Sequence, residues 1–316
     1  MHKLGFRFSL VILSSVLWIC SSSNLAAQQG STAGGVPAHM VVTVEAHHGT
    51  NVPVINREDV MVYEGRDRDK VIDWVPAQGD HAGLEIFVLL DDGSSASLGT
   101  QLEEIRKFIN AQPASTKIGV AYMQDGVARI EQNLTTDHAL AAKALRLPLG
   151  MSGVNGSPYF SLSDLIKKWP ESQSRREVFM ATDGIDRLYD SADLLDPYLA
   201  TAIEDAQKAG VLVYAIYTPG VGHYSHSYWR SYWGQLYLAQ LTDETGGESY
   251  YIGFTGSPVA FAPFLEDAAD RWNHQFLLTF LAKPEKKAGL RSVKLRTEVP
   301  NAELVSAEKV YVPAAP

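Results

Sequence analysis

The protein has 316 residues, of which 46% are hydrophobic and 20% are charged, and it contains a single cysteine. This is the composition of an ordinary globular protein, and it excludes the collagen-like, intrinsically disordered and disulfide-scaffold classes. The formal net charge is −9, from 27 basic and 36 acidic residues. We therefore expect no nucleic-acid partner, because binding to phosphates needs a dense set of Lys and Arg side chains.

The N-terminal segment predicts export. A basic start precedes an apolar run at residues 8–20, and the small residues Ala26 and Ala27 follow. This order is typical of a secretory signal peptide, which we assign to residues 1–27, and the apolar run is too short to span a bilayer. We expect a secreted or periplasmic protein with no transmembrane helix after cleavage. A lipoprotein anchored at Cys20 is the less favoured alternative, because bulky residues precede that cysteine.

Both ends of the remaining chain have the pattern of antiparallel β-structure. A Gly/Ser/Ala-rich lead-in at residues 28–37 is followed by residues 38–80, where short alternating segments are separated by Gly and Asn turns. Residues 274–316 return to this pattern. The strands predicted in the two segments are 40–44, 60–63, 71–75, 276–281, 292–297 and 309–312. Since neither segment is large enough to be stable alone, we expect both to pair into one β module.

Residues 84–273, which lie between these segments, alternate between predicted strands and helices. The continuous apolar run at 84–90 is typical of a central strand covered on both faces. The other predicted strands are 118–123, 128–131 (antiparallel), 178–181, 211–217 and 249–252, and the predicted helices are 101–109, 139–145, 162–169, 194–208, 235–245 and 260–273. Repeated β-α-β units predict an α/β fold, with a doubly wound and mostly parallel sheet inserted in the β module.

Open parallel sheets bind their ligands at the edge where the strands end, so we consider the residues that follow three of the predicted strands. Asp91, Asp92, Ser94 and Ser95 follow the first strand, and Asp183 follows the strand at 178–181. A long aromatic loop at residues 218–234 follows the strand at 211–217. We expect these three loops to lie together at one edge of the sheet.

An apolar strand, an Asp/Ser/Gly turn that opens a helix, and a later strand that ends in Thr-Asp-Gly resemble a von Willebrand factor type A domain. The flanking β segments make the whole chain similar to the bacterial VWFA-related secreted proteins typical of acidobacteria. The resemblance implies a metal-ion-dependent adhesion site for Mg²⁺, or for Mn²⁺ or Ca²⁺, which attracts a carboxylate of a protein partner. The residues that it implies as ligands are Asp91, Asp92, Ser94, Ser95 and Asp183.

The sequence departs from the family pattern at several positions. The first ligand is either Asp91 or Asp92, and each choice keeps only one of the two expected serines. Phe160 lies at the second-loop position where the family has Thr, if the helix begins at Leu162, and Ser157 or Ser161 replaces it only if that loop shifts. The metal site is therefore predicted to be degenerate. The alternative is that Asp91, Asp92 and Asp183 hold loop backbone and cap helices.

The loop at 218–234 is predicted to bind a partner. It carries five large aromatic residues, a type enriched where protein interfaces gain most of their binding energy. These are Tyr224, Tyr228, Trp229, Tyr232 and Trp233. The alternative is that the rings fold back to cover the edge of the sheet.

Other functions have weaker support in the sequence. Ser95 at a strand-to-helix turn, with Asp183 or Asp186 and His223 or His274, would give the residue order of a serine hydrolase, but the final Gly of that motif is absent. His223 and His226 lack a third zinc ligand nearby, and no phosphate-binding loop occurs, so we expect no nucleotide. We predict a secreted, non-enzymatic module that binds an extracellular or periplasmic protein. A metal-free structural component of the cell envelope is the further alternative.

Overall fold

The computed structural model describes residues 34–94, 96–150, 156–189, 196–220, 227–251 and 260–315. The predicted signal peptide, Cys20, most of the lead-in, Ser95, His223, Tyr224 and His226 lie outside the described residues, so the predictions made for them stay predictions. None of the helices in the described ranges is both long enough and apolar enough to cross a membrane.

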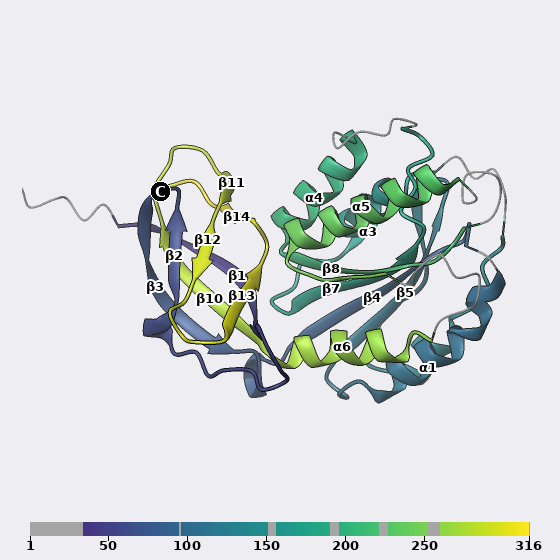
Figure 1. Ribbon diagram of the computed structural model, residues 1–316, viewed down its shortest axis with the longest axis horizontal. Coiled ribbons are helices and arrows are strands. Elements are labelled where there is room, and N and C mark those ends of the chain that lie inside the picture. The colour runs from purple at the N-terminus through teal and green to yellow at the C-terminus, as the bar shows by residue number, and fades with distance from the viewer. Residues whose placement is uncertain are drawn as a thin grey trace, which may run out of the picture. The chain divides into compact units, whose positions relative to one another are not determined.

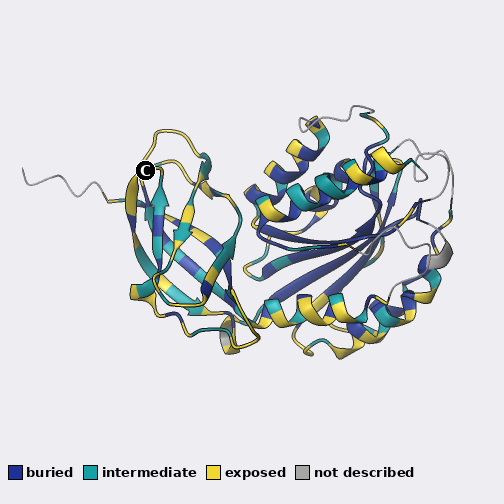
Figure 2. Ribbon diagram, in the orientation of Figure 1, coloured by how far each residue is buried: buried dark blue, intermediate teal, exposed yellow. Residues whose placement is uncertain are grey.

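A six-stranded sheet forms the centre of the α/β domain, in the order β6-β5-β4-β7-β8-β9 (Figure 1). All neighbouring pairs are parallel except β5 and β6, which are antiparallel, as the sequence predicts. The strands are β4 (Leu84–Asp91), β5 (Lys117–Gln124), β6 (Val127–Thr135), β7 (Arg175–Thr182), β8 (Val211–Tyr217) and β9 (Ser249–Tyr250). Every residue of β4 and β8 is buried, because helices cover both faces of the sheet (Figure 2).

The helices place their apolar sides on two hydrophobic cores, one on each face of this sheet. They are α1 (Leu102–Ala111), α2 (His138–Lys143), α3 (Pro158–Lys168), α4 (Pro197–Ala209), α5 (Tyr228–Thr245) and α6 (Ala262–Asn273), with short 3₁₀ helices at Arg57–Asp59, Gly79–His81 and Ala96–Thr100. Asp137 caps α2, since its side chain accepts a hydrogen bond from the backbone N–H of Leu140. Gly210 ends α4 in the left-handed conformation.

Two helices begin earlier than the sequence predicts. The helix predicted to start at residue 162 is α3, which starts at Pro158, because Ser157 caps it and proline suits the first helical turn. The helix predicted to start at residue 235 is α5, which starts at Tyr228. The second half of the expected aromatic loop is therefore helical.

Strands from both ends of the chain form the β module. Its six-stranded sheet has the order β12-β2-β3-β10-β1-β13, and β11 pairs with β14 in a second, two-stranded sheet. The strands are β1 (Val36–Ala46), β2 (Met61–Glu64), β3 (Asp67–Pro76), β10 (Gln275–Ala282), β11 (Gly289–Ser292), β12 (Lys294–Arg296), β13 (Ala302–Ser306) and β14 (Lys309–Val312). The antiparallel pairing of β1 and β3 with β10 confirms the predicted fold class, an α/β sheet inserted in an antiparallel module. β13 is absent from the prediction.

The chain enters and leaves the α/β domain at neighbouring points. β3 and β10 pair side by side, and the backbone N–H of Ala77 donates to the carbonyl of Gln275 at 2.9 Å. Arg175, at the start of β7, donates to the side chain of Gln275 and to the carbonyl of Trp272 at 2.8 Å. Gln275 in turn donates to Glu177 at 2.9 Å. Buried polar contacts therefore connect the central sheet to the first residue of β10.

Candidate functional site

The loops that follow β4, β7 and β8 meet at the C-terminal edge of the central sheet, because these three strands are neighbours. The hydroxyl of Thr182 donates to Asp91 at 2.6 Å, and the hydroxyls of Ser94 and Thr218 are 3.1 Å apart. The backbone N–H of Thr218 donates to the carbonyl of Thr182 at 2.9 Å. Hydrogen bonds thus connect three segments that are far apart in sequence. We call these segments, which follow β4, β7 and β8, the rim loops.

Asp91, the last residue of β4, faces the end of the neighbouring strand β7. Its two carboxylate oxygens accept hydrogen bonds from the backbone N–H of Gly93, at 2.8 Å, and from the Thr182 hydroxyl. Burial, and next the negative charge of Asp183, raise the pKa of Asp91 to about 6.

Asp183 is fully buried and pairs with an arginine that the sequence analysis did not single out. Nη2 of Arg187 lies 2.6 Å from Oδ2 of Asp183, and Nη1 donates to the carbonyl of Ile185 at 3.2 Å. The side chain of Arg187 is itself only 12% exposed. Burial opposes its charge, but the charges of Asp183 and Asp91 outweigh that effect and raise the pKa of Arg187.

Asp92 takes part in a different ion pair. The two terminal nitrogens of Arg146 donate to the two carboxylate oxygens of Asp92, at 2.6 and 2.8 Å. The backbone N–H of Leu149 also donates to this carboxylate, at 3.1 Å. The Arg146 guanidinium also stacks over the ring of Tyr122, 3.8 Å from its centre. Burial acts against ionisation of Asp92, but these hydrogen bonds prevail and lower its pKa. Of the two candidates for the first ligand, Asp91 is thus the one that contacts Thr182.

The second loop differs from the sequence-based alignment, which was wrong about where α3 begins. Ser157, and not Phe160, stands directly before the helix, and its hydroxyl donates to Asp186. Phe160 lies in the first helical turn, 47% exposed, with its ring edge-to-face with Tyr198 at 5.7 Å. Whether Ser157 or Ser161 takes the role of the missing Thr stays a prediction.

The sheet order, the single antiparallel edge strand β6 and the Asp residues at the ends of β4 and β7 agree with the motifs noted in the sequence. The α/β domain has a von Willebrand factor type A fold. Neither a family model nor a curated protein matches the sequence.

Several solved structures resemble this chain at low sequence identity. An aerotolerance-related membrane protein from Bacteroides fragilis is 13% identical, with a TM-score of 0.44 over 60% of this chain and 99% of that one. The conserved hypothetical protein BatB from Bacteroides thetaiotaomicron is 14% identical, with a TM-score of 0.45 over 60% of this chain and 97% of that one. A paralog of ArnB from Sulfolobus acidocaldarius, named as a VWA protein, is 9% identical, with a TM-score of 0.40 over 88% and 76% of the two chains.

The rim loops do not fit the divalent ion that this fold family implies. Mg²⁺ needs near-octahedral oxygen ligands and retains several waters. Within the described ranges, no group of three or more His, Cys, Asp or Glu side chains is placed to hold a metal ion. The carboxylates of Asp91 and Asp183 already accept hydrogen bonds from protein groups, and Arg187 supplies a positive charge beside them. Binding of Mg²⁺, Mn²⁺ or Ca²⁺ remains a sequence-based prediction.

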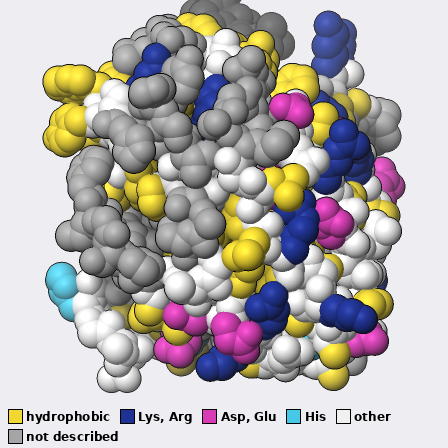
Figure 3. All heavy atoms as spheres, turned by 90° about the vertical axis from the view of Figure 1, so that its right-hand side faces the viewer, with side chains coloured by type: hydrophobic (Ala, Val, Ile, Leu, Met, Phe, Trp, Pro, Cys, Tyr) yellow, Lys and Arg dark blue, Asp and Glu magenta, His cyan; other side chains and the backbone are white. Residues whose placement is uncertain are grey.

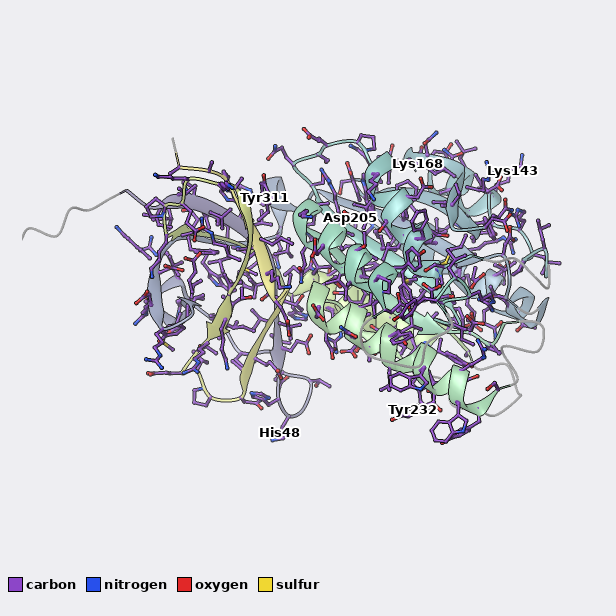
Figure 4. The ribbon with its side chains drawn as sticks, turned by 90° about the horizontal axis from the view of Figure 1, so that it is seen from above. His48, Lys143, Lys168, Asp205, Tyr232 and Tyr311 are labelled. Atoms are coloured by element: carbon purple, nitrogen blue, oxygen red, sulfur yellow. The ribbon has the colours of Figure 1, made fainter. Side chains whose placement is uncertain are left out.

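The predicted aromatic residues divide between surface and core. Tyr228, Trp229 and Tyr232 are 62%, 68% and 42% exposed, and Tyr232 projects outward from α5 (Figure 4). Trp233 packs inward instead, with its ring centre 5.9 Å from that of Tyr237 in the core below. Residues three and four positions apart are neighbours on a helix surface, and Tyr228 and Trp229 lie four and three positions before Tyr232. The three exposed rings therefore form a single aromatic face, which we call the α5 aromatic face.

Exposed apolar side chains concentrate around the rim loops. Eight of the eleven large hydrophobic residues that are exposed within the described ranges lie at this edge of the sheet. Five of them follow a strand at its C-terminal end or lie in the first turns of the helix after it: Leu188, Tyr228, Trp229, Tyr232 and Tyr251. Leu147 and Leu149 lie in the loop after α2, where the backbone N–H of Leu149 donates to Asp92, and Phe160 lies in the first turn of α3 beside the turn that follows β5. Figure 3 looks onto this side, where the hydrophobic side chains of the described residues are interspersed with both basic and acidic side chains. A protein surface that binds no partner seldom exposes so many large apolar residues in one region.

Two other candidate sites lie apart from the rim. A cavity of about 810 Å³ opens between α1, α6 and residues 77–82, near the N-terminal ends of the strands, and none of the predicted site residues lines it. His274, a candidate for the hydrolase alternative, bonds to the carbonyl of Asp270 at 2.9 Å where α6 meets β10. His274 therefore lies away from Ser94, the described serine of the first loop.

Proposed function

We propose that this protein is a non-enzymatic binding protein that holds a protein partner against the C-terminal rim of its type A domain. The observation that carries the proposal is the concentration of exposed large apolar residues at this rim. Aromatic anchors surrounded by polar and basic groups are typical of the centre of a protein interface. The signal peptide expected from the sequence would place the partner outside the cytoplasm, in the periplasm or beyond.

The α5 aromatic face is the strongest part of this surface. Trp229 and Tyr232 are one helical turn apart, and rigid rings lose little conformational entropy when a partner covers them. Tyr228 packs edge-to-face with Trp229, with ring centres 5.7 Å apart, which holds the indole in a defined orientation. A preorganised pair of rings favours affinity, because less freedom is lost on binding.

Photo-crosslinking in the exporting cell tests the proposal. A photoreactive amino acid at position 229 should capture a defined partner, whereas the same group at Tyr311, an exposed aromatic residue of the β module, should not. With the purified partner, the double variant Trp229→Ala/Tyr232→Ala should weaken binding about thirtyfold or more in calorimetry. Tyr311→Ala is the matched control and should leave affinity unchanged. Equal binding by wild type and the double variant would show that the rim is not the interface.

The non-enzymatic part of the proposal has its own test. A fluorophosphonate probe labels an activated serine, so the folded protein should remain unlabelled. Covalent labelling of a rim serine would instead support the hydrolase alternative.

A further inference from the structure

The positive charge at the rim loops comes from the chain itself. Two buried carboxylates, Asp91 and Asp183, end adjacent strands, and two like charges at such a site repel each other unless a cation compensates them. Arg187 is the cation at this site: its Nη2 lies 2.6 Å from Oδ2 of Asp183, and Thr182, the residue directly before Asp183, donates to Asp91. Arg187 lies only four residues after Asp183, in the same loop.

The guanidinium of Arg187 is held on several sides. Its two terminal nitrogens reach both oxygens of Asp183, at 2.6 and 3.4 Å, and one of them also donates to the carbonyl of Ile185. With 12% of its side chain exposed, this arginine belongs to the interior of the rim and not to its solvated surface. A planar guanidinium that donates to both oxygens of one carboxylate has a defined orientation, whereas a charged side chain in solvent does not.

The remaining oxygens at the site also have protein partners. Those of Asp91 accept from Gly93 and Thr182, and the hydroxyl of Ser94 lies against that of Thr218. A divalent ion would have to break these contacts and displace a buried guanidinium before it could bind. Its gain from two carboxylates would be offset by the loss of the buried ion pair between Arg187 and Asp183.

We propose that Arg187 takes the place of the divalent cation in this type A domain. The guanidinium then acts as a built-in counter-ion that holds the ends of β4 and β7 together, and the rim keeps its shape without metal. Without a bound metal ion, a carboxylate of the partner has no ion to coordinate. The partner is then recognised by the apolar surface around the rim loops. The role of Arg187 is independent of the proposed partner binding, and each can fail alone.

Thermal unfolding and calorimetric titration with Mg²⁺, Mn²⁺ and a chelator test this proposal on the purified protein. The wild type should give no binding heat, and its Tm should not change with either ion or with chelator. Arg187→Gln removes the charge and leaves the two carboxylates uncompensated, so its Tm should fall, and millimolar Mn²⁺ should raise it again by about 3 °C or more. Arg146→Gln is the matched control, because it removes the partner of the other rim aspartate, Asp92. Its Tm should fall without recovery in Mn²⁺.

Two results would overturn the proposal. The first is saturable binding of Mg²⁺ or Mn²⁺ to the wild type with a rise in Tm, which would show that the ion site is intact. The second is an Arg187→Gln variant whose Tm is indifferent to ions, which would reduce Arg187 to an ordinary structural ion pair. If Arg187→Gln does not fold, Arg187→Lys decides, since it keeps the charge. A folded and ion-indifferent Lys variant supports the proposal, whereas a Lys variant that is unfolded or stabilised by Mn²⁺ contradicts it.

Discussion

The backbone of Gly184 lies directly against that of Gly234, and this contact fixes α5 on the loop that carries Asp183. A Cβ atom on Gly184 would lie 2.3 Å from the carbonyl oxygen of Gly234, and one on Gly234 would lie 2.3 Å from that of Asp183. Gly184 also has a φ of +66°, a conformation that residues with a side chain rarely adopt. The close approach places the α5 aromatic face next to the rim loops.

Substituting Gly234 with alanine should push the backbones of Gly184 and Gly234 apart. The added methyl group has no room, so we expect the free energy of unfolding to fall by about 1–3 kcal/mol, the usual cost of overpacking. Urea denaturation followed by circular dichroism measures the loss. Gly289→Ala is the control, because a Cβ atom there meets no other atom within 4 Å. Identical midpoints for the two variants would mean that the helix moves at no cost.

Removing Arg146 should destabilise the protein more than removing a surface cation. Arg146→Ala leaves the carboxylate of Asp92, whose side chain is 3% exposed, without its counter-charge, and we expect a loss of about 2–4 kcal/mol in the free energy of unfolding. Lys208→Ala removes an exposed pair with Glu204 and should cost less than about 0.5 kcal/mol. Chemical denaturation of both variants makes the comparison. A loss below about 1 kcal/mol for Arg146→Ala would contradict the assigned role.

Stability should depend on pH through Glu177. Burial raises the pKa of this carboxyl to about 8, against the opposing effects of Arg175 and the hydrogen bond from Gln275. The unfolded chain therefore releases this proton near its ordinary pKa of 4.5, well before the folded protein does. It follows that the contribution of Glu177 to the free energy of unfolding falls as the pH rises from about 5 to about 8.

Glu177→Gln should remove this slope, because the amide keeps a hydrogen-bond partner in Gln275 but does not titrate. We expect the variant to gain about 2–4 kcal/mol over the wild type on going from pH 5.5 to pH 8.5. Urea denaturation at both pH values gives the difference. Parallel pH profiles for the two proteins would show that Glu177 is already ionised in the fold.

The exported protein should begin at Gln28. Intact-mass measurement of the protein from the medium or periplasm should show the loss of 27 residues and no lipid. A mass that corresponds to a chain beginning at a lipidated Cys20 would support the anchored alternative. Retention of Met1 in an exported protein would rule out both forms of processing.

The sequence predicts the strands of this fold better than its helix starts. The apolar run of β4 and the Asp-Gly turn before β6 are local signals, and both elements form where they are expected. The start of α5 is obscured because its apolar residues lie on opposite sides of the helix: Trp229 and Tyr232 face outward, whereas Leu238 and Leu241 face the core. Such a segment lacks the one-sided apolar periodicity that indicates a helix. β13 has only five residues, with Glu303 among them, and gives no strand signal.

The candidate site is predictable only in part. Asp91, Ser94 and Asp183 follow from their positions after strands, and the structure places all three among the rim loops. The pairing of Asp92 with Arg146 joins residues 54 positions apart, which no local pattern reveals. Arg187 stands close enough to Asp183 for a signal to exist, namely a basic residue four positions after the strand-end aspartate. Whether such an arginine folds back onto the loop or extends into solvent depends on tertiary packing.

The chain enters the α/β domain after β3 and leaves it at β10, and these two strands are paired. This arrangement has a mechanical consequence. Since β1 and β14 both belong to the β module, tension applied between Val36 and Val312 would be borne first by the interstrand hydrogen bonds of that module. The α/β domain would carry no load until the contact between Ala77 and Gln275 separated. A molecule tethered through the β module would then be stretched there while the rim loops stayed folded.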